Sequence, residues 1–341
     1  MDAFQIKGQI LLSDMILALK QNSLTDMQSI PKSDLHSHGA RGGRVSYIEN
    51  WAGVKISLPP KVFASSDSVT ALSTMDKWFK ENIRPHCLGY RGHLKRWEAT
   101  FAQAHSDTVA LLSMSFRSVE IRKYFDRLDD FIKTITEMSK EFAANTIILP
   151  ELTFAREDCD TDYEFVFLEE ALSHGFFKSI DICGDEFAQP IKNFKKMFKY
   201  SKAKGLVLKA HVGEFGTADD VMEAVEELEL HEVHHGNAVY KSPQIMNWLA
   251  KNKIQLNLCP ASNIMLGIFE GYSSYPIKKI VEAGIPVTIN TDDLLIFNLS
   301  LSEEYLNLFN ANLLDEYELD KIRETGLSAI HRYNEKGLKG G

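Results

Sequence analysis

The sequence predicts a single (β/α)8 TIM barrel, with a helix before the first strand and a helical insertion after it. Three observations point to this fold: eight short apolar runs, helical patterns between most of them, and a length of 341 residues, which suits one such barrel. Apolar strands that alternate with helices are typical of a parallel sheet buried on both faces. An open doubly wound sheet is the alternative, but no Gly-x-Gly-x-x-Gly motif opens a helix after a strand.

The predicted elements begin with an amphipathic helix over residues 4–19. We assign strands by length and β-branched content, and helices by their apolar periodicity. Strands are expected at 33–38, 108–116, 145–154, 178–184, 206–212, 232–238, 254–259 and 286–292. Helices are expected at 129–143, 162–173, 190–203, 217–229, 241–252 and 275–283. A closed barrel of these strands brings all their carboxyl ends to one rim.

The connection after the first strand is far longer than the others. Residues 39–107 carry many aromatic side chains, among them Tyr47, Trp51, Trp78 and Phe79. A long insertion at this end of a barrel is where enzymes build a lid or a substrate pocket, although it could instead only buttress the barrel. We therefore expect one domain over residues 1–341, with residues 39–107 as a helical lid within it.

Composition narrows the function. The net charge is −9 and the acidic residues are spread along helices, so a nucleic-acid partner is not expected. No apolar run approaches the roughly 18–20 residues that span a bilayer, and Asp14 and Lys20 interrupt the N-terminal helix, so neither a membrane partner nor a signal peptide is expected. The four cysteines show no Cys-x-x-Cys spacing, which favours a reduced, cytoplasmic protein. The oligomeric state is left open.

Two histidines stand two residues apart in the stretch Pro31-Lys32-Ser33-Asp34-Leu35-His36-Ser37-His38-Gly39. In a strand, residues i and i+2 point to the same face, so His36 and His38 should share one space while Leu35 faces the other way. An isolated pair of this kind is more often one packed and one solvated histidine. The pair indicates a metal only if the chain supplies further ligands.

Further ligands lie in or at the end of three later strands. They are His211 with Glu214 at the end of the fifth strand, His235 in the sixth, and Asp292 with Asp293 at the end of the eighth. Singly, Asp292 could cap a helix and Glu214 could favour a helix dipole. Together they would share one rim with the histidine pair, where polar side chains need partners. This convergence predicts a metal site.

The ligand types restrict the metal and its chemistry. Imidazoles with one carboxylate and no thiolate suit zinc, with iron or another transition ion as the alternative. A zinc ion with an open position lowers the pKa of bound water towards 7, so the expected reaction is attack by water on an electrophilic carbon.

The ordered motifs resemble the adenosine/AMP deaminase family within the amidohydrolase-type, metal-dependent barrels. The resemblance extends from about residue 31 to 305 and is carried by Leu35-His36-Ser37-His38, Gly184-Asp185-Glu186, His211-Val212-Gly213-Glu214, His235-Gly236, Cys259-Pro260-Ala261-Ser262-Asn263 and Thr288-Ile289-Asn290-Thr291-Asp292-Asp293 followed by Leu295-Ile296-Phe297. It implies one zinc ion per chain, with these ligands: His36, His38, His211 and Asp292.

The resemblance also implies roles in deamination. Glu214 would protonate purine N1 as hydroxide attacks C6, and burial beside other carboxylates can raise its pKa for this purpose. His235 would orient the hydroxide and, with Asp292, supply a proton to the leaving ammonia. Asp293 would hold purine N7 and the Gly184 N–H would meet N3, although Gly184 could be a simple turn glycine. The zinc ligand His38 is also expected to face the substrate, and Ser262 and Asn263 to brace their loop.

Three departures from the family stand out. Ala40 occupies the position of a residue, often an acid, that helps hold the ribose. Arg41 and Arg44 flank Gly42-Gly43 just beyond, and could grip an anionic or 5′-substituted substrate unless they pair with surface acids. His234 replaces a common glycine and should point away from His235, so it is unassigned; Leu294 replaces a common proline, which changes loop stiffness.

The predicted function is zinc-dependent hydrolytic deamination of a small-molecule purine, adenosine or 2′-deoxyadenosine, to inosine or deoxyinosine with release of ammonia. A first alternative is a deaminase of AMP, methylthioadenosine or S-adenosylhomocysteine. A second is hydrolysis of an amide or an ester with the same metal. Against it, the sequence has no lysine at a strand end that is suited to bridging two metals. A third, from another class, is a catalytically silent nucleoside-binding relative.

Overall fold

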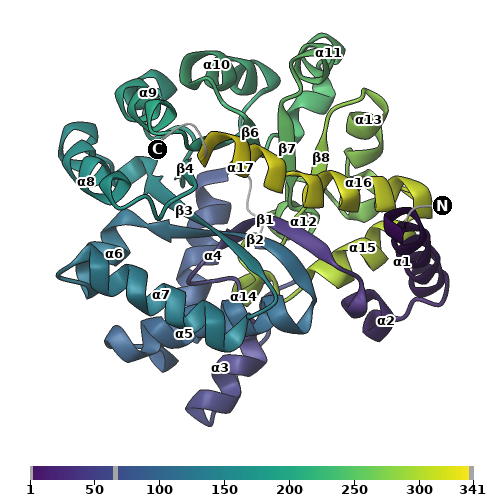
Figure 1. Cartoon of the computed structure of the whole chain (residues 1–341), viewed down its shortest axis with the longest axis horizontal. Helices are drawn as coiled ribbons and strands as arrows, with labels where there is room; N and C mark the ends of the chain where they lie inside the picture. Colours follow the sequence, from purple (N-terminus) through teal and green to yellow (C-terminus); the bar gives the residue numbers. More distant parts are fainter. Residues whose placement is uncertain (1–2, 64–67, 338–341) are drawn as a thin grey trace.

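The eight strands close into a barrel. The computed structural model describes residues 3–63 and 68–337, and these residues form one eight-stranded sheet in the order β1 to β8 (Figure 1). Each neighbouring pair is parallel, and a bridge between Ser37 and Asp292 joins the two edges, which confirms the predicted (β/α)8 fold. The strands are β1 Lys32–His38, β2 Val109–Arg117, β3 Ile147–Ala155, β4 Ser179–Cys183, β5 Val207–Val212, β6 Glu232–His235, β7 Gln255–Leu258 and β8 Val287–Ile289.

Helices surround the barrel, and all those expected from the sequence are present. Their ends shift by at most two residues, except that α9 begins at Lys195 instead of residue 190, because the 3-10 helix η3 precedes it. Local capping explains several starts: the Thr217 hydroxyl accepts the Asp220 N–H at the start of α10. The helices are α1 Ala3–Lys20, α2 Leu24–Ser29, α3 Val45–Ala52, α4 Ser68–Asn82, α5 Gly89–Ser106, α6 Ser118–Tyr124, α7 Leu128–Phe142, α8 Thr161–Ser173, α9 Lys195–Ala203, α10 Ala218–Leu228, α11 Pro243–Asn252, α12 Pro260–Met265, α13 Ile277–Glu282, α14 Leu294–Phe297, α15 Leu301–Asn310, α16 Glu316–Ser328 and α17 Ile330–Gly337. Short 3-10 helices are η1 Arg84–His86, η2 Arg156–Asp158, η3 Ile191–Phe194, η4 Asn237–Lys241 and η5 Tyr272–Ser274.

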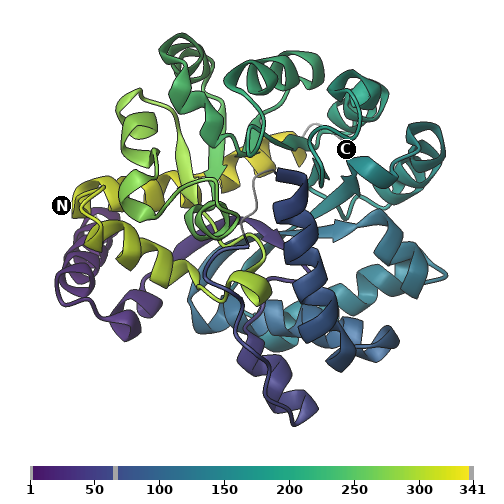
Figure 2. The same cartoon turned by 180° about the vertical axis from the view of Figure 1, so that it is seen from behind.

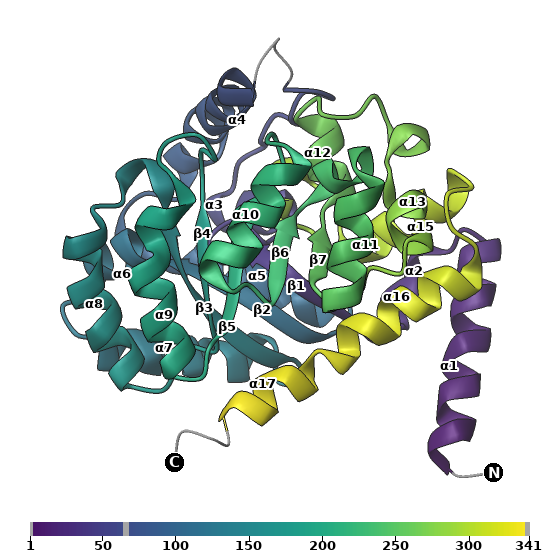
Figure 3. The same ribbon diagram turned by 90° about the horizontal axis from the view of Figure 1, so that it is seen from above.

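The two ends of the barrel are covered differently. Helix α4, from the insertion at 39–107, lies at one end, and α16 and α17 lie at the other (Figures 2 and 3). Met75 and Phe79 of α4 pack in a separate apolar cluster with Leu266, which follows α12, and Leu295 of α14. Because those partners follow β7 and β8, α4 covers the rim at which the strands end. No helix of the described residues is both long enough and apolar enough to cross a bilayer.

The inside of the barrel is unusually polar. Ala210 and Val212 of β5 point outward into the large apolar cluster between strands and helices, so Lys209 and His211 point inward. Lys209 is fully buried, with its Nζ 2.8 Å from Glu151 Oε2 and 3.6 Å from Glu232 Oε2. Arg332 of α17 reaches Glu232 Oε1 at 2.5 Å. A chain of ion pairs therefore links α17, at the end of the barrel opposite the rim, to the buried layer beneath the rim.

Three expectations about local geometry are wrong. Strand β8 ends at Ile289, not at residue 292, and Asp292 adopts a left-handed backbone with φ 59°. Strand β6 ends at His235, which has φ 62°, so its ring turns back into the barrel instead of pointing away from that of His234. Leu35 packs inside the barrel, because the β1–β2 register shifts between Asp34 and Ser37.

Candidate metal centre and active site

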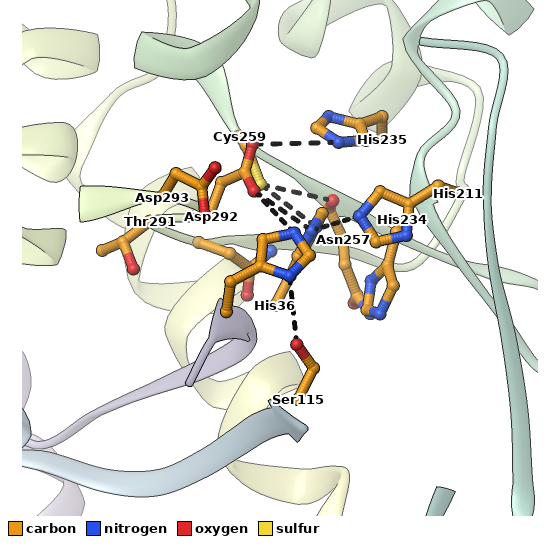
Figure 4. A network of polar contacts seen from close by, with 12 residues as sticks. His36, Ser115, His211, His234, His235, Asn257, Cys259, Thr291, Asp292 and Asp293 are labelled. Carbon is orange, nitrogen blue, oxygen red and sulfur yellow. Dashed lines mark hydrogen bonds and ion pairs between the residues drawn. The ribbon is translucent and has the colours of Figure 1, made fainter. Parts of the chain in front are cut away.

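Four side chains converge at the rim, as the sequence predicts for a metal centre. One ligand atom from each lies within 4.8 Å of the others, and the residues are His36, His38, His211 and Asp292. The Nε2 atoms of His36 and His211 are 2.9 Å apart, and Asp292 Oδ1 lies 3.1 Å from His38 Nε2 (Figure 4). The turn at Asp292 directs this carboxylate: its N–H donates to His36 O, and its carbonyl accepts the His38 N–H.

Each of these histidines is held through its other ring nitrogen. His38 Nδ1 lies 3.0 Å from Ser115 Oγ, His36 Nδ1 lies 3.3 Å from Cys259 Sγ, and His211 Nδ1 lies 3.1 Å from Asp181 Oδ1. Such partners orient imidazoles so that Nε2 faces a metal.

The donor set fits a zinc-like cation. Burial and the neighbouring histidines hold the pKa of His36 well below its usual value, so this ring is neutral and can ligate. Burial also opposes charge on His38, but the Asp293 and Asp292 carboxylates outweigh it and raise its pKa to about 9. A bound cation would replace a proton there.

Glu214 is held over this centre by a carboxylate and an amide. Glu186 accepts the backbone N–H groups of Gly213, Glu214 and Phe215 at 2.7–2.8 Å, which fixes the loop after β5. The Asn263 amide donates to Glu214 Oε1 at 3.1 Å. Burial, followed by the charges of Asp292, Glu186 and Asp293, raises the pKa of Glu214 well above its usual value. The side chain therefore holds its proton to higher pH than an ordinary carboxyl group does, as a general acid requires.

His235 lies between Glu214 and Asp292. Its Nε2 is 3.6 Å from Glu214 Oε1 and 3.9 Å from Asp292 Oδ2, while its Nδ1 is 3.2 Å from Asn263 Nδ2. Burial chiefly lowers the pKa of His235, to about 3, so the ring is neutral at neutral pH. Asn263 contacts both Glu214 and His235, which agrees with the bracing role expected from the sequence.

One carboxylate oxygen of Asp293 accepts a hydrogen bond and the other has no partner among the described residues. Arg41 donates to its Oδ2 at 3.0 Å, and the same guanidinium donates to Asp76 of α4 at 3.1 Å. Asp293 Oδ1 is buried without a hydrogen-bond partner among the described residues. A buried acceptor without a partner is costly, which suggests that a ligand meets it.

The remaining predicted site residues are placed less centrally. Arg44 pairs with Glu303 and donates to Asn298 O at 3.2 Å, so its charge is already matched by an acid. Gly184 follows β4 and has φ 87°, and a Cβ there would lie 2.1 Å from Glu157 Oε2. The His234 ring lies against that of His36, with centroids 3.9 Å apart and the planes tilted by 31°, and its Nε2 is 3.3 Å from Glu151 Oε1. It lies beneath the metal ligands.

Sequence reasoning gave no role to Ser115, Asp181 or Glu186. Asp181 carried a signal, because it is an acid inside the otherwise apolar strand Ser179–Cys183. Glu186 lies within a quoted motif, but its three backbone partners are visible only in the folded chain. Ser115 carried no signal.

The fold and this centre define a class: a (β/α)8 hydrolase of the metal-dependent amidohydrolase type, with its site at the carboxyl ends of the strands. The chain belongs to the adenosine deaminase family, whose model matches residues 119–336, well over half of the sequence. It is thus an adenosine/adenine deaminase-like hydrolytic deaminase that acts on amidine C–N bonds.

Curated relatives agree at the level of the family. A Treponema pallidum (strain Nichols) protein, provisionally named adenosine/adenine deaminase, is 29% identical over 300 residues, 88% of this chain and 98% of that protein. An adenine deaminase of Crocosphaera subtropica is 33% identical over 172 residues, 50% of this chain and 52% of that protein. The chain thus spans nearly all of the first relative and about half of the second.

Solved structures share the fold at low identity. The adenine deaminase of Arthrobacter aurescens has a TM-score of 0.74 at 17% identity, covering 91% of this chain and 98% of that one. A zinc-bound amidohydrolase of Burkholderia ambifaria has a TM-score of 0.68 at 15% identity, covering 92% of each chain. The N6-methyl-AMP deaminase of Arabidopsis thaliana has a TM-score of 0.68 at 19% identity, covering 92% of this chain and 95% of that one.

Proposed function

We propose that the protein deaminates a 6-aminopurine nucleoside, adenosine or 2′-deoxyadenosine, by hydrolysis, yielding inosine or deoxyinosine and ammonia. One observation carries this proposal: a buried Glu214, whose pKa is raised by its surroundings, lies beside a four-residue ligand set whose donors suit zinc. Replacing an amino group at purine C6 by oxygen requires an activated water, a proton for ring N1 and a proton for the leaving ammonia. This site has groups suited to each task.

The metal would be held by the four residues already described, His36, His38, His211 and Asp292. When bound, a zinc ion supplies the Lewis acidity that makes water a nucleophile at neutral pH. Ser115, Cys259 and Asp181 keep the three imidazoles aimed at that position.

Proton transfers are assigned to Glu214 and His235. Protonated Glu214 donates to purine N1, which makes C6 more electrophilic. Neutral His235 orients the attacking water and accepts a proton from it, and with Asp292 returns a proton to the departing amino group. Asn263 keeps Glu214 and His235 in register, since its amide contacts both.

Purine recognition is assigned to Asp293 and Gly184. Asp293 Oδ1, buried and without a partner among the described side chains, faces purine N7 in this proposal; because both atoms are acceptors, a proton shared between them makes the hydrogen bond. The Gly184 N–H meets N3 on the opposite edge of the ring. Only a glycine allows the close packing at position 184, because a Cβ there would clash with Glu157.

Free adenine is the second candidate substrate. Relatives named adenine deaminase support it, as does Ala40, which offers no hydrogen bond to a ribose. AMP is less favoured, because Arg41 and Arg44, the cations nearest this turn, already pair with Asp293 and Glu303. A silent nucleoside-binding relative is disfavoured by the complete set of polar groups at the site.

Metal analysis combined with an ammonia-release screen tests the proposal. The substrates are adenosine, 2′-deoxyadenosine, adenine, AMP, methylthioadenosine and S-adenosylhomocysteine. We expect about one zinc per chain, the highest kcat/KM with a nucleoside, loss of activity after chelation and recovery on adding zinc. Binding of nucleosides without ammonia release would instead establish the silent relative, and a best rate with adenine or AMP would reassign the substrate.

A further inference from the structure

The loops after β3 and β4 place a carboxylate against the glycine that the proposed function assigns to purine N3. Glu157 lies in η2, directly after β3, and its Oε2 accepts the Asp185 N–H at 3.2 Å. A Cβ at Gly184 would lie 2.1 Å from Glu157 Oε2 and 2.8 Å from Oε1. Only glycine at 184 lets this carboxylate occupy its position.

The loop that carries Glu157 is firmly braced. Arg156, buried beside it, donates to the carbonyl oxygens of Glu186 at 2.8 Å and His211 at 2.6 Å. The Gln189 amide donates to the carbonyl oxygens of Arg156 and Cys159. These bonds join the ends of β3, β4 and β5. The backbone that carries Glu157 is therefore joined to the backbone that holds Gly184 and the metal ligand His211.

Glu157 is nevertheless open to a ligand. Its side chain is exposed, and its Oε1 has no hydrogen-bond partner within residues 3–63 and 68–337. On a purine, N3 and N9 are both bonded to C4, so a group that meets N3 lies beside whatever N9 carries. A carboxylate packed on Gly184 therefore borders the N9 substituent and can accept hydrogen bonds from it.

The charges around this edge are unfavourable for an anion. Asp158 and Asp185 flank Glu157 and Gly184 in the chain. Arg117, at the end of β2, lies 3.8 Å from Asp158 Oδ2. Arg41 pairs with Asp293, and Arg44 pairs with Glu303. Each of these three cations thus already has a carboxylate beside it.

We propose that Glu157 is the residue that reads the N9 substituent: it accepts a ribose hydroxyl and discriminates against 5′-phosphorylated purines. This inference rests on the proposed function, because it uses the placement of N3 at Gly184. The acid that holds the ribose is then Glu157, directly after β3, and not a residue at position 40, where Ala40 stands. The substrate class is uncharged ribosyl purines.

The test compares kcat/KM of the full-length, zinc-loaded enzyme for adenosine, adenine and AMP in the wild type and in Glu157→Gln. Gln keeps the shape of the side chain and can still accept the Asp185 N–H. We expect kcat/KM for adenosine to fall about tenfold, mainly through KM, because a ribose contact contributes equally before and during the reaction. The ratio of kcat/KM for AMP to kcat/KM for adenosine should rise at least tenfold once one like charge is removed. The value of kcat/KM for adenine should change less than twofold.

Glu137→Gln is the matched control. Glu137 lies on the outer helix α7, where it is exposed and pairs with Lys133. The substitution therefore removes one negative charge, as Glu157→Gln does, but away from the rim. Equal changes for all three substrates in Glu157→Gln, no change, or a loss confined to adenine would overturn the inference. A wild type that releases no ammonia from any substrate would instead overturn the proposed function. The two failures are therefore distinguishable.

Discussion

At the scale of single residues, the chemistry depends on how neighbouring groups hold each side chain. Glu214 acquires its high pKa from burial beside three other carboxylates, while Glu186 and Asn263 fix its position. His211 has a different task, because its Nε2 points at the metal position and its Nδ1 at Asp181. Substitutions at these two residues should therefore separate proton transfer from metal binding.

Glu214→Gln should retain zinc and lose most turnover, by a factor of about 100 or more, because the amide cannot donate an equivalent proton to N1. His211→Ala should lose both zinc and turnover. Metal content and kcat, measured on the same preparations, check this. Retained activity in Glu214→Gln would remove the role assigned to it.

The pH profile offers a second reading of Glu214. Because its pKa lies well above the usual value, the active protonated form persists to higher pH than in an ordinary carboxyl group, and kcat should fall as pH rises through that raised pKa. A kcat that already falls as pH rises through about 4 to 5, the range of an ordinary carboxyl group, would contradict the raised pKa.

Arg41 should act on substrate affinity through Asp293. Arg41→Gln removes the guanidinium from Asp293 Oδ2 and also its bond to Asp76 of α4. We expect KM to rise about tenfold, with zinc content unchanged, since the carboxylate assigned to N7 loses its support. Asp76→Asn, which weakens only the link to α4, is the control. If it raises KM as much as Arg41→Gln, Arg41 acts through the helix instead.

At the scale of elements, α4 is the part of the insertion that covers the rim. Phe79 is buried in the cluster that joins α4 to Leu266 and Leu295. The Arg41 guanidinium lies 4.7 Å from the Phe79 ring centroid, and that of Arg96 lies 5.5 Å away. Because this cluster is separate from the main core, we propose that α4 can open as a lid without unfolding the barrel.

Phe79→Ala should loosen α4 selectively. Loss of the ring removes packing of the order of 3 kcal/mol, so amide hydrogen exchange over residues 70–82 should accelerate while exchange in the strands is unchanged. KM should rise in parallel. Tyr163→Ala, an exposed aromatic on α8, should alter neither quantity. Uniform acceleration throughout the barrel would show that α4 is part of the main cooperative unit.

The elements also show where prediction from sequence reaches its limit. Strand and helix positions follow from apolar periodicity, and those predictions held within a few residues. The ends of β6 and β8 were predicted three residues too long, because His235 and Asp292 adopt left-handed backbones that periodicity does not indicate. Those two turns aim the catalytic imidazole and the fourth metal ligand. The least predictable backbone is thus the backbone that builds the site.

At the scale of the whole molecule, α17 lies at the end of the barrel opposite the rim and pairs there with the charged layer inside the barrel. Burial alone would raise the pKa of Glu232, but Lys209 and Arg332 outweigh it and lower that pKa to about 2. A carboxyl group with a lowered pKa in the folded state stabilises the fold above its unfolded pKa. That contribution is lost as pH falls from about 4.5 towards 2.

Stability should accordingly decrease between pH 5 and pH 3, by about 2 kcal/mol from Glu232 alone. Glu232→Gln should flatten this part of the profile. Arg332→Gln should destabilise the protein at pH 6, because it removes one of the two cations that offset the buried carboxylate. Urea unfolding at pH 6, 5 and 3 measures all three proteins. A profile for Glu232→Gln that matches the wild type would place the acid sensitivity elsewhere.

The sequence by itself determined the barrel, the family and the identities of the residues at the rim. Apolar periodicity sets the strands and helices, and closure of a parallel barrel then brings distant strand ends together regardless of their spacing in the chain. That is why the histidines at positions 36, 38 and 211 could be grouped with Asp292 before any geometry was known.

Only the tertiary structure decided which groups hold those residues and which cations remain available. Ser115, Asp181 and Glu186 support the site through contacts between strands far apart in sequence, and no local pattern encodes such contacts. Arg41 and Arg44 follow an anion-binding pattern in the sequence, yet in the folded chain both face carboxylates. Pairing of charges depends on distances of a few ångströms, and these are set by packing of the entire chain.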